Sequence, residues 1–204
     1  MNQEPKVFIV DDDDAVRRYI GRLLDQVGIA HEGYPSAEEF LETMEPRSPG
    51  CLLLDVRMPG MGGRALQDRL AEKEINLPIL FMTGHGEVSM AVEALHKGAV
   101  DFLQKPFNDQ ALLDRVQKAI QQDAEERLAN EEREASARRL SQLTPREVEV
   151  VDLVLEGLSN KQIAFKLSVS PQAIDARRSN AMKKLGVGSI AELITVVLKS
   201  RGES

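Results

Sequence analysis

The stretch from Cys51 to Gly60 constrains the fold of this chain more than any other. A Cys and three Leu residues lead directly into one carboxylate, Asp55, and a Pro-Gly pair follows shortly after it. An apolar run that stops at a turn signal indicates a fully buried strand. Because open α/β sheets bind ligands at the carboxyl ends of their parallel strands, we expect Asp55 to lie at a binding edge.

Three other segments show the same construction, an apolar run that ends in polar side chains. These polar ends are Asp11 and Asp12 after residues 6–10, Thr83 after residues 79–82, and Lys105 after residues 101–104. One Lys cannot neutralise so many carboxylates, so the cluster predicts a hard divalent cation, Mg²⁺ or Mn²⁺. Asp55 is then a candidate nucleophile for a phosphoryl group, with Lys105 and Thr83 stabilising charge on the transferred oxygens.

Strand and helix patterns alternate through the first 122 residues. This alternation predicts an α/β fold with a doubly wound, five-stranded parallel sheet. The expected strands are 6–11, 30–34, 51–55, 79–83 and 101–104. The expected helices are 14–27, 36–45, 63–73, 88–97 and 109–122. The glycine-rich segment 60–63 lacks the Lys-Ser/Thr ending of a phosphate-binding P-loop, so we interpret it as a turn.

With these motifs the chain resembles, over about residues 5–122, the receiver domain of two-component response regulators. The resemblance rests on Asp11-Asp12, on Asp55 with Met58-Pro59, on Thr83-Gly84, and on the segment from Gly98 to Phe107. It implies that Asp55 is the phosphoacceptor. It also implies four roles around it: Asp12 and Asp55 as side-chain metal ligands, the Arg57 backbone carbonyl as a third ligand, Asp11 as a ligand through water, and Thr83 and Lys105 as phosphoryl contacts.

Composition points to two domains with different partners. The formal charge is -7, with acids in excess over the first 122 residues and a mildly basic end. The single cysteine, Cys51, excludes an internal disulfide and is expected to be a core residue in a reducing compartment. We find no membrane-span pattern and no signal-peptide core, so we expect a cytoplasmic protein without a membrane partner.

The predicted domains are 1–122, a helical linker at 123–140, and a C-terminal domain at 141–204. The linker is rich in Glu, Arg, Ala and Gln and contains neither Gly nor Pro, which predicts an exposed helix. An apolar stripe enters it through Leu113, Val116, Ile120, Ala124 and Leu128. The stripe is too short for a clear coiled coil, so a solvated helix and a dimeric coiled coil both remain open, the former favoured.

The sequence of the C-terminal domain predicts four short helices. Capping-box patterns start at Thr144, Ser159 and Ser189, and Ser170-Pro171 is a further start signal. Only three residues separate the second and third helices, as in a helix-turn-helix. Ile174, Ala181 and Leu185 form an inward stripe on the third helix. The candidate DNA-binding residues are Lys161, Gln172, Asp175, Ala176, Arg178, Ser179, Lys183 and Lys184. The alternative is a small bundle with a solvated basic face.

Residues 141–200 resemble the LuxR-type DNA-binding domain. The resemblance rests on Leu143–Glu147, Gly157–Ala164 and Ser170–Ile174. A receiver joined to this domain is the arrangement of the NarL/FixJ response regulators, and the segments 90–95 and 98–102 are most similar to the FixJ branch. The recognition helix departs from the family, because Ile174-Asp175-Ala176-Arg177 stands where Val-Lys-Val-His or Val-Glu-Val-His is usual. The family's base preferences therefore do not carry over.

We expect a transcription regulator rather than an enzyme, with at most slow self-dephosphorylation. An aspartyl phosphatase would carry Asp-x-Asp, but Arg57 stands at the second position. His31, His85 and His96 lack metal-ligand spacing. The remaining alternative is a receiver that no longer takes phosphate and serves as an interaction module on a constitutive DNA-binding protein.

Phosphorylation is expected to act through Thr83 and Phe102. Thr83 would move towards the phosphoryl group, and the Phe102 ring would swing into the space behind it, as the resemblance implies. This would reshape a surface of helix 88–97 and strand 101–104, where Val88, Ala91, Val92, Leu95 and Ala99 offer apolar contacts to a second receiver. The expected partners are a sensor histidine kinase, a second copy when phosphorylated, and double-stranded DNA with two half-sites, with RNA polymerase left open.

Overall fold

The structure is a computed structural model that describes residues 4–84 and 98–202. Its chain divides into two compact units, residues 1–126 and 127–204. The expected helix 88–97, and with it Val88, Ala91, Val92 and Leu95, lies outside the described residues. So do His85 and His96.

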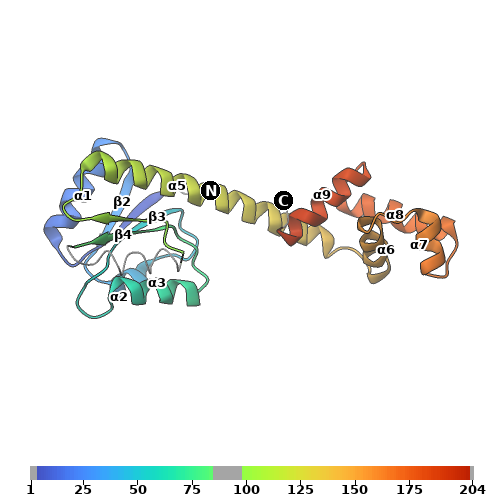
Figure 1. The fold of residues 1–204 in the computed structure, drawn as a ribbon, viewed down its shortest axis with the longest axis horizontal. Helices are drawn as coiled ribbons and strands as arrows, with labels where there is room; N and C mark the ends of the chain where they lie inside the picture. The colour runs from blue at the N-terminus through green and yellow to red at the C-terminus, as the bar shows by residue number, and fades with distance from the viewer. Residues whose placement is uncertain (1–3, 85–97, 203–204) are drawn as a thin grey trace. The chain divides into compact units, whose positions relative to one another are not determined.

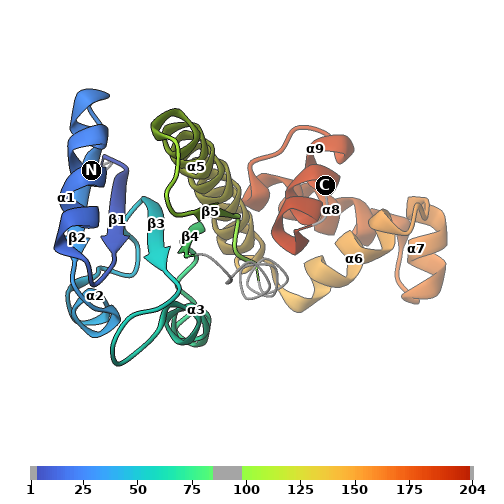
Figure 2. The same ribbon diagram turned by 60° about the vertical axis from the view of Figure 1, so that its left-hand side comes forward.

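A five-stranded parallel sheet forms the centre of the N-terminal unit. Its strands are β1 (Lys6–Val10), β2 (Ala30–Tyr34), β3 (Gly50–Asp55), β4 (Ile79–Thr83) and β5 (Asp101–Gln104). They lie in the order β2-β1-β3-β4-β5, which can be followed from left to right in Figure 2. Every strand begins and ends within one residue of its predicted range, and the predicted fold class is confirmed.

Helices cover both faces of this sheet (Figure 1). They are α1 (Asp14–Gln26), α2 (Ala37–Thr43), α3 (Gly63–Glu72) and α5 (Asp109–Leu140). The helices α1 and α5 lie on one face and α2 and α3 on the other, so each face has its own apolar core. Phe81 points into the core beneath α2 and α3, whereas Cys51 and Leu53 point into the core beneath α1 and α5. Strands buried on both faces explain the continuous apolar runs of the sequence.

The helix α5 continues through the predicted linker without a break. Its first part belongs to the sheet's core, because Val116 is fully buried and Leu113 and Ile120 pack beside it. Leu128 is 59% exposed. The first three residues of the apolar stripe therefore cover the sheet and do not face a coiled-coil partner.

The C-terminal unit is all-helical. Besides the end of α5 it contains α6 (Pro145–Leu155), α7 (Asn160–Lys166), α8 (Pro171–Leu185) and α9 (Ile190–Arg201). Complete capping boxes start α6 at Thr144 and α7 at Ser159. At Ser189 the predicted box is only half formed, because the Glu192 carboxylate accepts from the Gly188 N–H instead.

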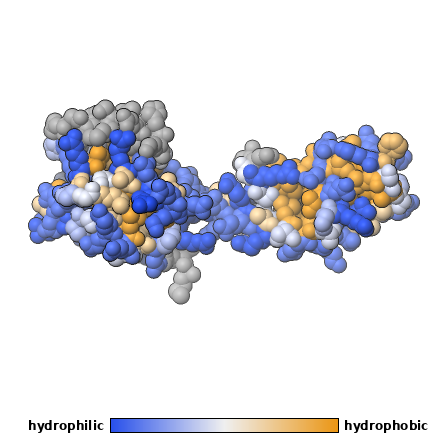
Figure 3. Space-filling model, turned by 90° about the horizontal axis from the view of Figure 1, so that it is seen from below, coloured by the Kyte–Doolittle hydropathy of each residue, from blue (hydrophilic) through white to orange (hydrophobic). Residues whose placement is uncertain are grey.

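One apolar core joins these helices. Ile163 from α7 and Ile174 and Ala181 from α8 are fully buried in it, together with Val150 of α6. The surface of the C-terminal unit also carries hydrophobic areas (Figure 3). On this unit, Phe165 of α7 is 89% exposed. Within residues 4–84 and 98–202, every helix is too short or too polar to span a bilayer.

Candidate functional site

The carboxyl ends of β1, β3 and β5 bring three of the predicted side chains into direct contact. Asp55 is the last residue of β3, and Asp11 follows β1, which is paired with β3. The Lys105 Nζ lies 2.6 Å from Asp11 Oδ2 and 3.0 Å from Asp55 Oδ2. The backbone N–H of Lys105 donates to the Thr83 carbonyl at 2.7 Å, which fixes the start of this loop against the end of β4.

Burial and charge act against each other in this cluster. Burial raises the pKa of Asp55, and the ammonium group of Lys105 only partly offsets that effect. Burial by itself would lower the pKa of Lys105, but the hydrogen bonds and negative charges of Asp11 and Asp55 together outweigh it and raise this pKa. Lys105 therefore stays protonated and holds two carboxylates close together.

The cluster fits a hard divalent cation. Asp11, Asp12 and Asp55 each offer an oxygen atom, and these three atoms lie within 4.8 Å of one another. Asp11 is buried, Asp55 nearly so, and Asp12 is exposed, so one side of the cluster is open to solvent. Three carboxylates against one ammonium group leave excess negative charge, and oxygen ligands with room for water suit Mg²⁺.

An unused hydroxyl group faces the same edge. Thr83 is the last residue of β4 and fully buried, and its Oγ1 has no hydrogen-bond partner in the part of the chain that the structure describes. A buried hydroxyl usually has a partner, so an unpartnered one indicates a ligand or a second state. An incoming group with acceptor oxygens would satisfy it.

Phe102 lies where the predicted relay needs an aromatic ring. It pairs in register with Phe81 across β4 and β5, and Thr83 is two residues further along β4. Side chains two residues apart on a strand share a face, so all three lie on the α2 and α3 side of the sheet. Phe102 is partly buried and packs against this core.

Three further residues support this edge, and none of them was among the predicted site residues. The Arg17 Nη1 donates to the Asp11 carbonyl at 2.6 Å. The Asp13 N–H donates to Asp11 Oδ1 at 2.9 Å, while its side chain caps α1. Gly63 packs so tightly that a Cβ there would lie 2.2 Å from the Asp55 carbonyl oxygen. Only the cap at Asp13 was recognisable from sequence as a helix-start signal.

On the C-terminal unit, α8 presents the predicted polar face. Ile174, Ala181 and Leu185 are its buried residues, as predicted. Six of the candidate DNA contacts on this helix are exposed: Gln172, Asp175, Ala176, Ser179, Lys183 and Lys184. Lys161 is exposed at the start of α7.

Three of the candidate DNA contacts have partners within the domain. The side-chain NH₂ group of Asn160 donates to Asp175 Oδ1. The Arg178 guanidinium group donates to the side chain of Asn160. The Lys184 ammonium group lies 2.7 Å from Glu147 Oε2. DNA contact by Lys184 would therefore require an existing ion pair to break, which makes it a weaker candidate than Lys161 or Lys183.

Comparisons with known proteins agree with both halves of the chain. Residues 7–117 match the family model of the response regulator receiver domain, and residues 141–197 match that of bacterial regulatory proteins of the luxR family. The transcriptional regulatory protein FixJ of Azorhizobium caulinodans is 38% identical over 198 residues, covering 97% of this chain and 94% of the relative. Nodulation protein W of Bradyrhizobium diazoefficiens is 42% identical over 188 residues, covering 92% of this chain and 83% of the relative.

Solved structures are similar over the full length. The response regulator StyR aligns with a TM-score of 0.84 at 43% identity, covering 97% of this chain and 100% of that chain. Full-length FixJ from B. japonicum aligns with a TM-score of 0.61 at 37% identity, and both chains are covered completely.

Proposed function

The chain belongs to the family of response regulators that join a receiver domain to a LuxR-type DNA-binding domain, and from this premise we propose which residues carry each step. It is a two-component response regulator that controls transcription. The observation that carries the proposal is the contact of Lys105 with Asp11 and Asp55 at the edge where Thr83 lies, whose hydroxyl group has no partner among the described residues.

Asp55 is the phosphoacceptor. A carboxylate oxygen of Asp55 attacks the phosphorus of a phosphohistidine on a sensor kinase, the P–N bond breaks, and the imidazole leaves with its electron pair and takes a proton. Lys105 neutralises charge on the transferred oxygens as the new O–P bond forms. Asp11, Asp12, Asp55 and the Arg57 carbonyl would hold Mg²⁺ or Mn²⁺, with Asp11 acting through water. When bound, this metal supplies Lewis-acid stabilisation of the phosphoryl oxygens.

The Thr83 hydroxyl group then donates to the new phosphoryl oxygens. Phosphorylation adds about 1.5 to 2 negative charges and three strong acceptors, which is enough to draw in an unpartnered donor. Phe102 occupies the space that Thr83 leaves, and the surface around β5 changes shape. A second phosphorylated copy docks there.

Pairing of two chains places two helix-turn-helix units on two DNA half-sites. Half-sites of a two-fold dimer lie about 10 base pairs, or one helical turn, apart. Lys161, Lys183 and Arg178 contact phosphates, and Lys184 joins them where its ion pair opens. Gln172, Asp175, Ala176 and Ser179 face the base edges. Since the operator is chromosomal DNA, the protein acts in the cytoplasm, where RNA polymerase is a further candidate partner. The chain turns over no external substrate. Its only expected hydrolysis is the slow removal of its own phosphoryl group.

Phosphorylation with radiolabelled acetyl phosphate and Mg²⁺ tests the acceptor site. The wild-type chain is expected to take up one phosphoryl label. Asp55→Asn is expected to take up none, although it remains as stably folded as the wild type. Equal labelling of Asp55→Asn would contradict the assignment. An unlabelled wild-type chain that still binds DNA would instead identify the receiver as an interaction module.

Sedimentation with and without beryllofluoride, a phosphoryl mimic, tests the activation step. We expect a monomer that dimerises and gains DNA affinity when the mimic is present. Thr83→Ala is expected to bind the mimic without that gain. A saturated wild-type chain that remains monomeric would refute the dimer mechanism.

A further inference from the structure

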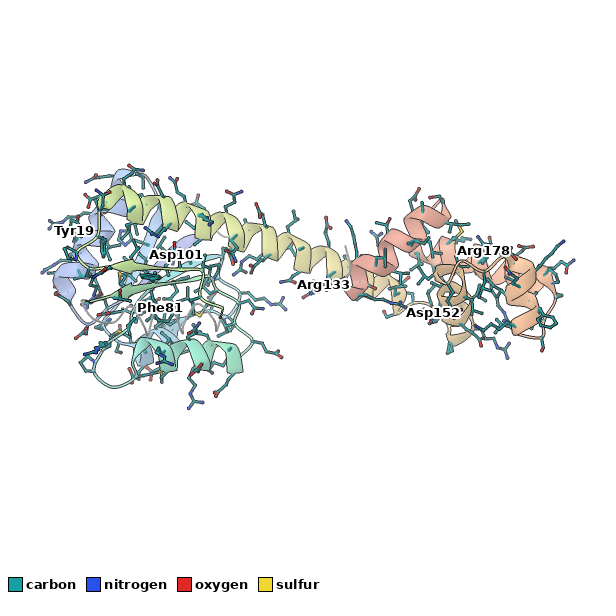
Figure 4. All side chains as sticks on the ribbon, in the orientation of Figure 1. Tyr19, Phe81, Asp101, Arg133, Asp152 and Arg178 are labelled. Atoms are coloured by element: carbon teal, nitrogen blue, oxygen red, sulfur yellow. The ribbon has the colours of Figure 1, made fainter. Side chains whose placement is uncertain are left out.

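Asn160 bridges two charged residues of the recognition helix. It is the first residue of α7, and its side-chain NH₂ group donates to Asp175 Oδ1 on α8. Its side-chain oxygen accepts from Arg178 Nη1 (Arg178 is labelled in Figure 4). The two ends of the amide cannot be exchanged, because a carboxylate only accepts and a guanidinium only donates.

This bridge leaves Asp175 partly free for an external partner. Asp175 is exposed, and Asn160 uses one of its two carboxylate oxygens. A carboxylate offers about four acceptor sites, so capacity remains for a second donor. Asn160, Asp175 and Arg178 line one surface hollow together with Ser179 and Lys183, so the acid lies among the groups proposed to face DNA.

An acid on a DNA-facing surface needs a compensating contact, because the phosphates repel it. Among the base edges of the major groove, cytosine offers an N4 amino donor with no acceptor beside it. Guanine and thymine present acceptors at the corresponding position, and adenine places its N7 acceptor next to its N6 donor. A fixed carboxylate therefore favours cytosine.

We propose that Asp175 selects a cytosine in each DNA half-site and that Asn160 is the positioning residue that holds its carboxylate in place. The proposal rests on the DNA-binding function above and adds the base that is recognised. Arg178 fixes the orientation of the Asn160 amide and supplies a positive charge beside the acid. The bond to Asn160 keeps the acid in one rotamer before DNA arrives, which reduces the ordering cost of recognition.

Selection from a library of randomised DNA half-sites, with the full-length chain in beryllofluoride and Mg²⁺, tests this inference. The wild-type chain is expected to prefer cytosine at one position of each half-site by roughly 5- to 100-fold over the other bases. Asp175→Asn keeps the shape but replaces the acceptor-only group with an amide. Because Asn pairs with the N6 and N7 atoms of adenine, the preference at that position is expected to change from cytosine to adenine.

Asn160→Ala tests the positioning role. We expect it to weaken the cytosine preference at the same position without installing another base, while the melting temperature and the other positions of the selected sequence stay unchanged. Asn180→Ala is the matched control, because Asn180 is exposed on α8 and lies outside the proposed DNA contacts, and it is expected to leave the cytosine position intact. A residue with only a structural role would lower stability and affinity for all sequences equally.

The outcomes separate the inference from the proposed function. A folded wild-type chain that binds no DNA would refute the function and the inference together. DNA binding in which Asp175→Asn keeps the wild-type preference at every position would overturn the inference alone. An unchanged cytosine preference in Asn160→Ala would overturn the positioning role.

Discussion

A buried hydrogen bond between α5 and the start of β3 allows a quantitative test of how the long helix is held to the receiver. Asp123 Oδ2 accepts from the Gly50 N–H at 2.8 Å, and the Asp123 side chain is 3% exposed. Gly50 has φ +136, and a Cβ there would lie 1.8 Å from the Lys6 carbonyl oxygen. The replacement Asp123→Ala removes the acceptor and leaves this N–H group buried.

The expected cost follows from the chemistry of the bond. A hydrogen bond to a charged group contributes about 1.5 to 3 kcal/mol, and an unpaired buried donor costs a similar amount. Ala is a better helix former than Asp by roughly 0.5 kcal/mol, which offsets part of the loss. The free energy of unfolding of the N-terminal unit should therefore fall by about 1 to 2.5 kcal/mol. Asp123→Asn keeps an acceptor oxygen, so a smaller loss, about half, is expected.

Urea denaturation followed by tyrosine fluorescence measures this unit specifically. The chain contains no Trp, and its only two tyrosines, Tyr19 and Tyr34, both belong to the N-terminal unit. With an m-value of about 1.5 kcal/mol/M, the midpoint for Asp123→Ala should fall by roughly 1 M. The m-value itself should stay constant.

Glu125→Ala is the matched control, because Glu125 is an exposed residue on the same helix and bonds only to Gln121 in the described contacts. Its midpoint should correspond to a change within about 0.5 kcal/mol. Equal midpoints for Asp123→Ala and Glu125→Ala would refute the reasoning, since they would mean that the buried bond contributes nothing to the attachment of α5.

Three other predictions concern separate parts of the chain. Gly63→Ala should slow labelling by acetyl phosphate at least tenfold and lower the melting temperature, because its Cβ would displace the Asp55 carbonyl. The ion pair with Lys184 and the N–H of Thr144 lower the pKa of Glu147 to about 2, so its stabilising effect is complete above about pH 4.5 and is lost as the pH falls to about 2. Calorimetry should therefore show a stability difference between wild type and Glu147→Gln that disappears over this range. Burial raises the pKa of Cys51 to about 12, so a thiol reagent at pH 8 should modify it only after unfolding.

Each of these predictions has a control or a contradicting result. Gly33→Ala is the control for the first, because a Cβ at Gly33 would meet only the flexible Arg17 side chain at 3.6 Å. If the difference in stability between wild type and Glu147→Gln stays constant from pH 7 to pH 2, the charge of Glu147 is excluded as its cause. Rapid modification of Cys51 in the native chain would mean that the sheet opens locally.

The order of the described secondary-structure elements and the ends of the strands could be predicted from the sequence, because they depend on local pattern. The end of the helix predicted at 109–122 could not, because α5 continues to Leu140. Buried parallel strands require unbroken apolar runs, such as Cys51–Leu54, and helix starts require capping side chains such as Thr144 and Ser159. The polar residues of the candidate site could also be placed, since a strand that ends in Asp55 must present it at the sheet edge. The predicted roles of the site residues remain to be tested.

The tertiary structure decided which side chains from distant segments meet. Nothing in the pattern around Asp123 indicates that it reaches Gly50, 73 positions away. Nor does the pattern around Lys184 indicate that it pairs with Glu147 on another helix. Asn160, which the sequence marked only as part of a motif, holds Asp175 and Arg178 from another helix. Such contacts depend on the packing of one element against another. Hydrophobic periodicity indicates which face of an element is buried, but it does not indicate which atoms of another element that face will contact.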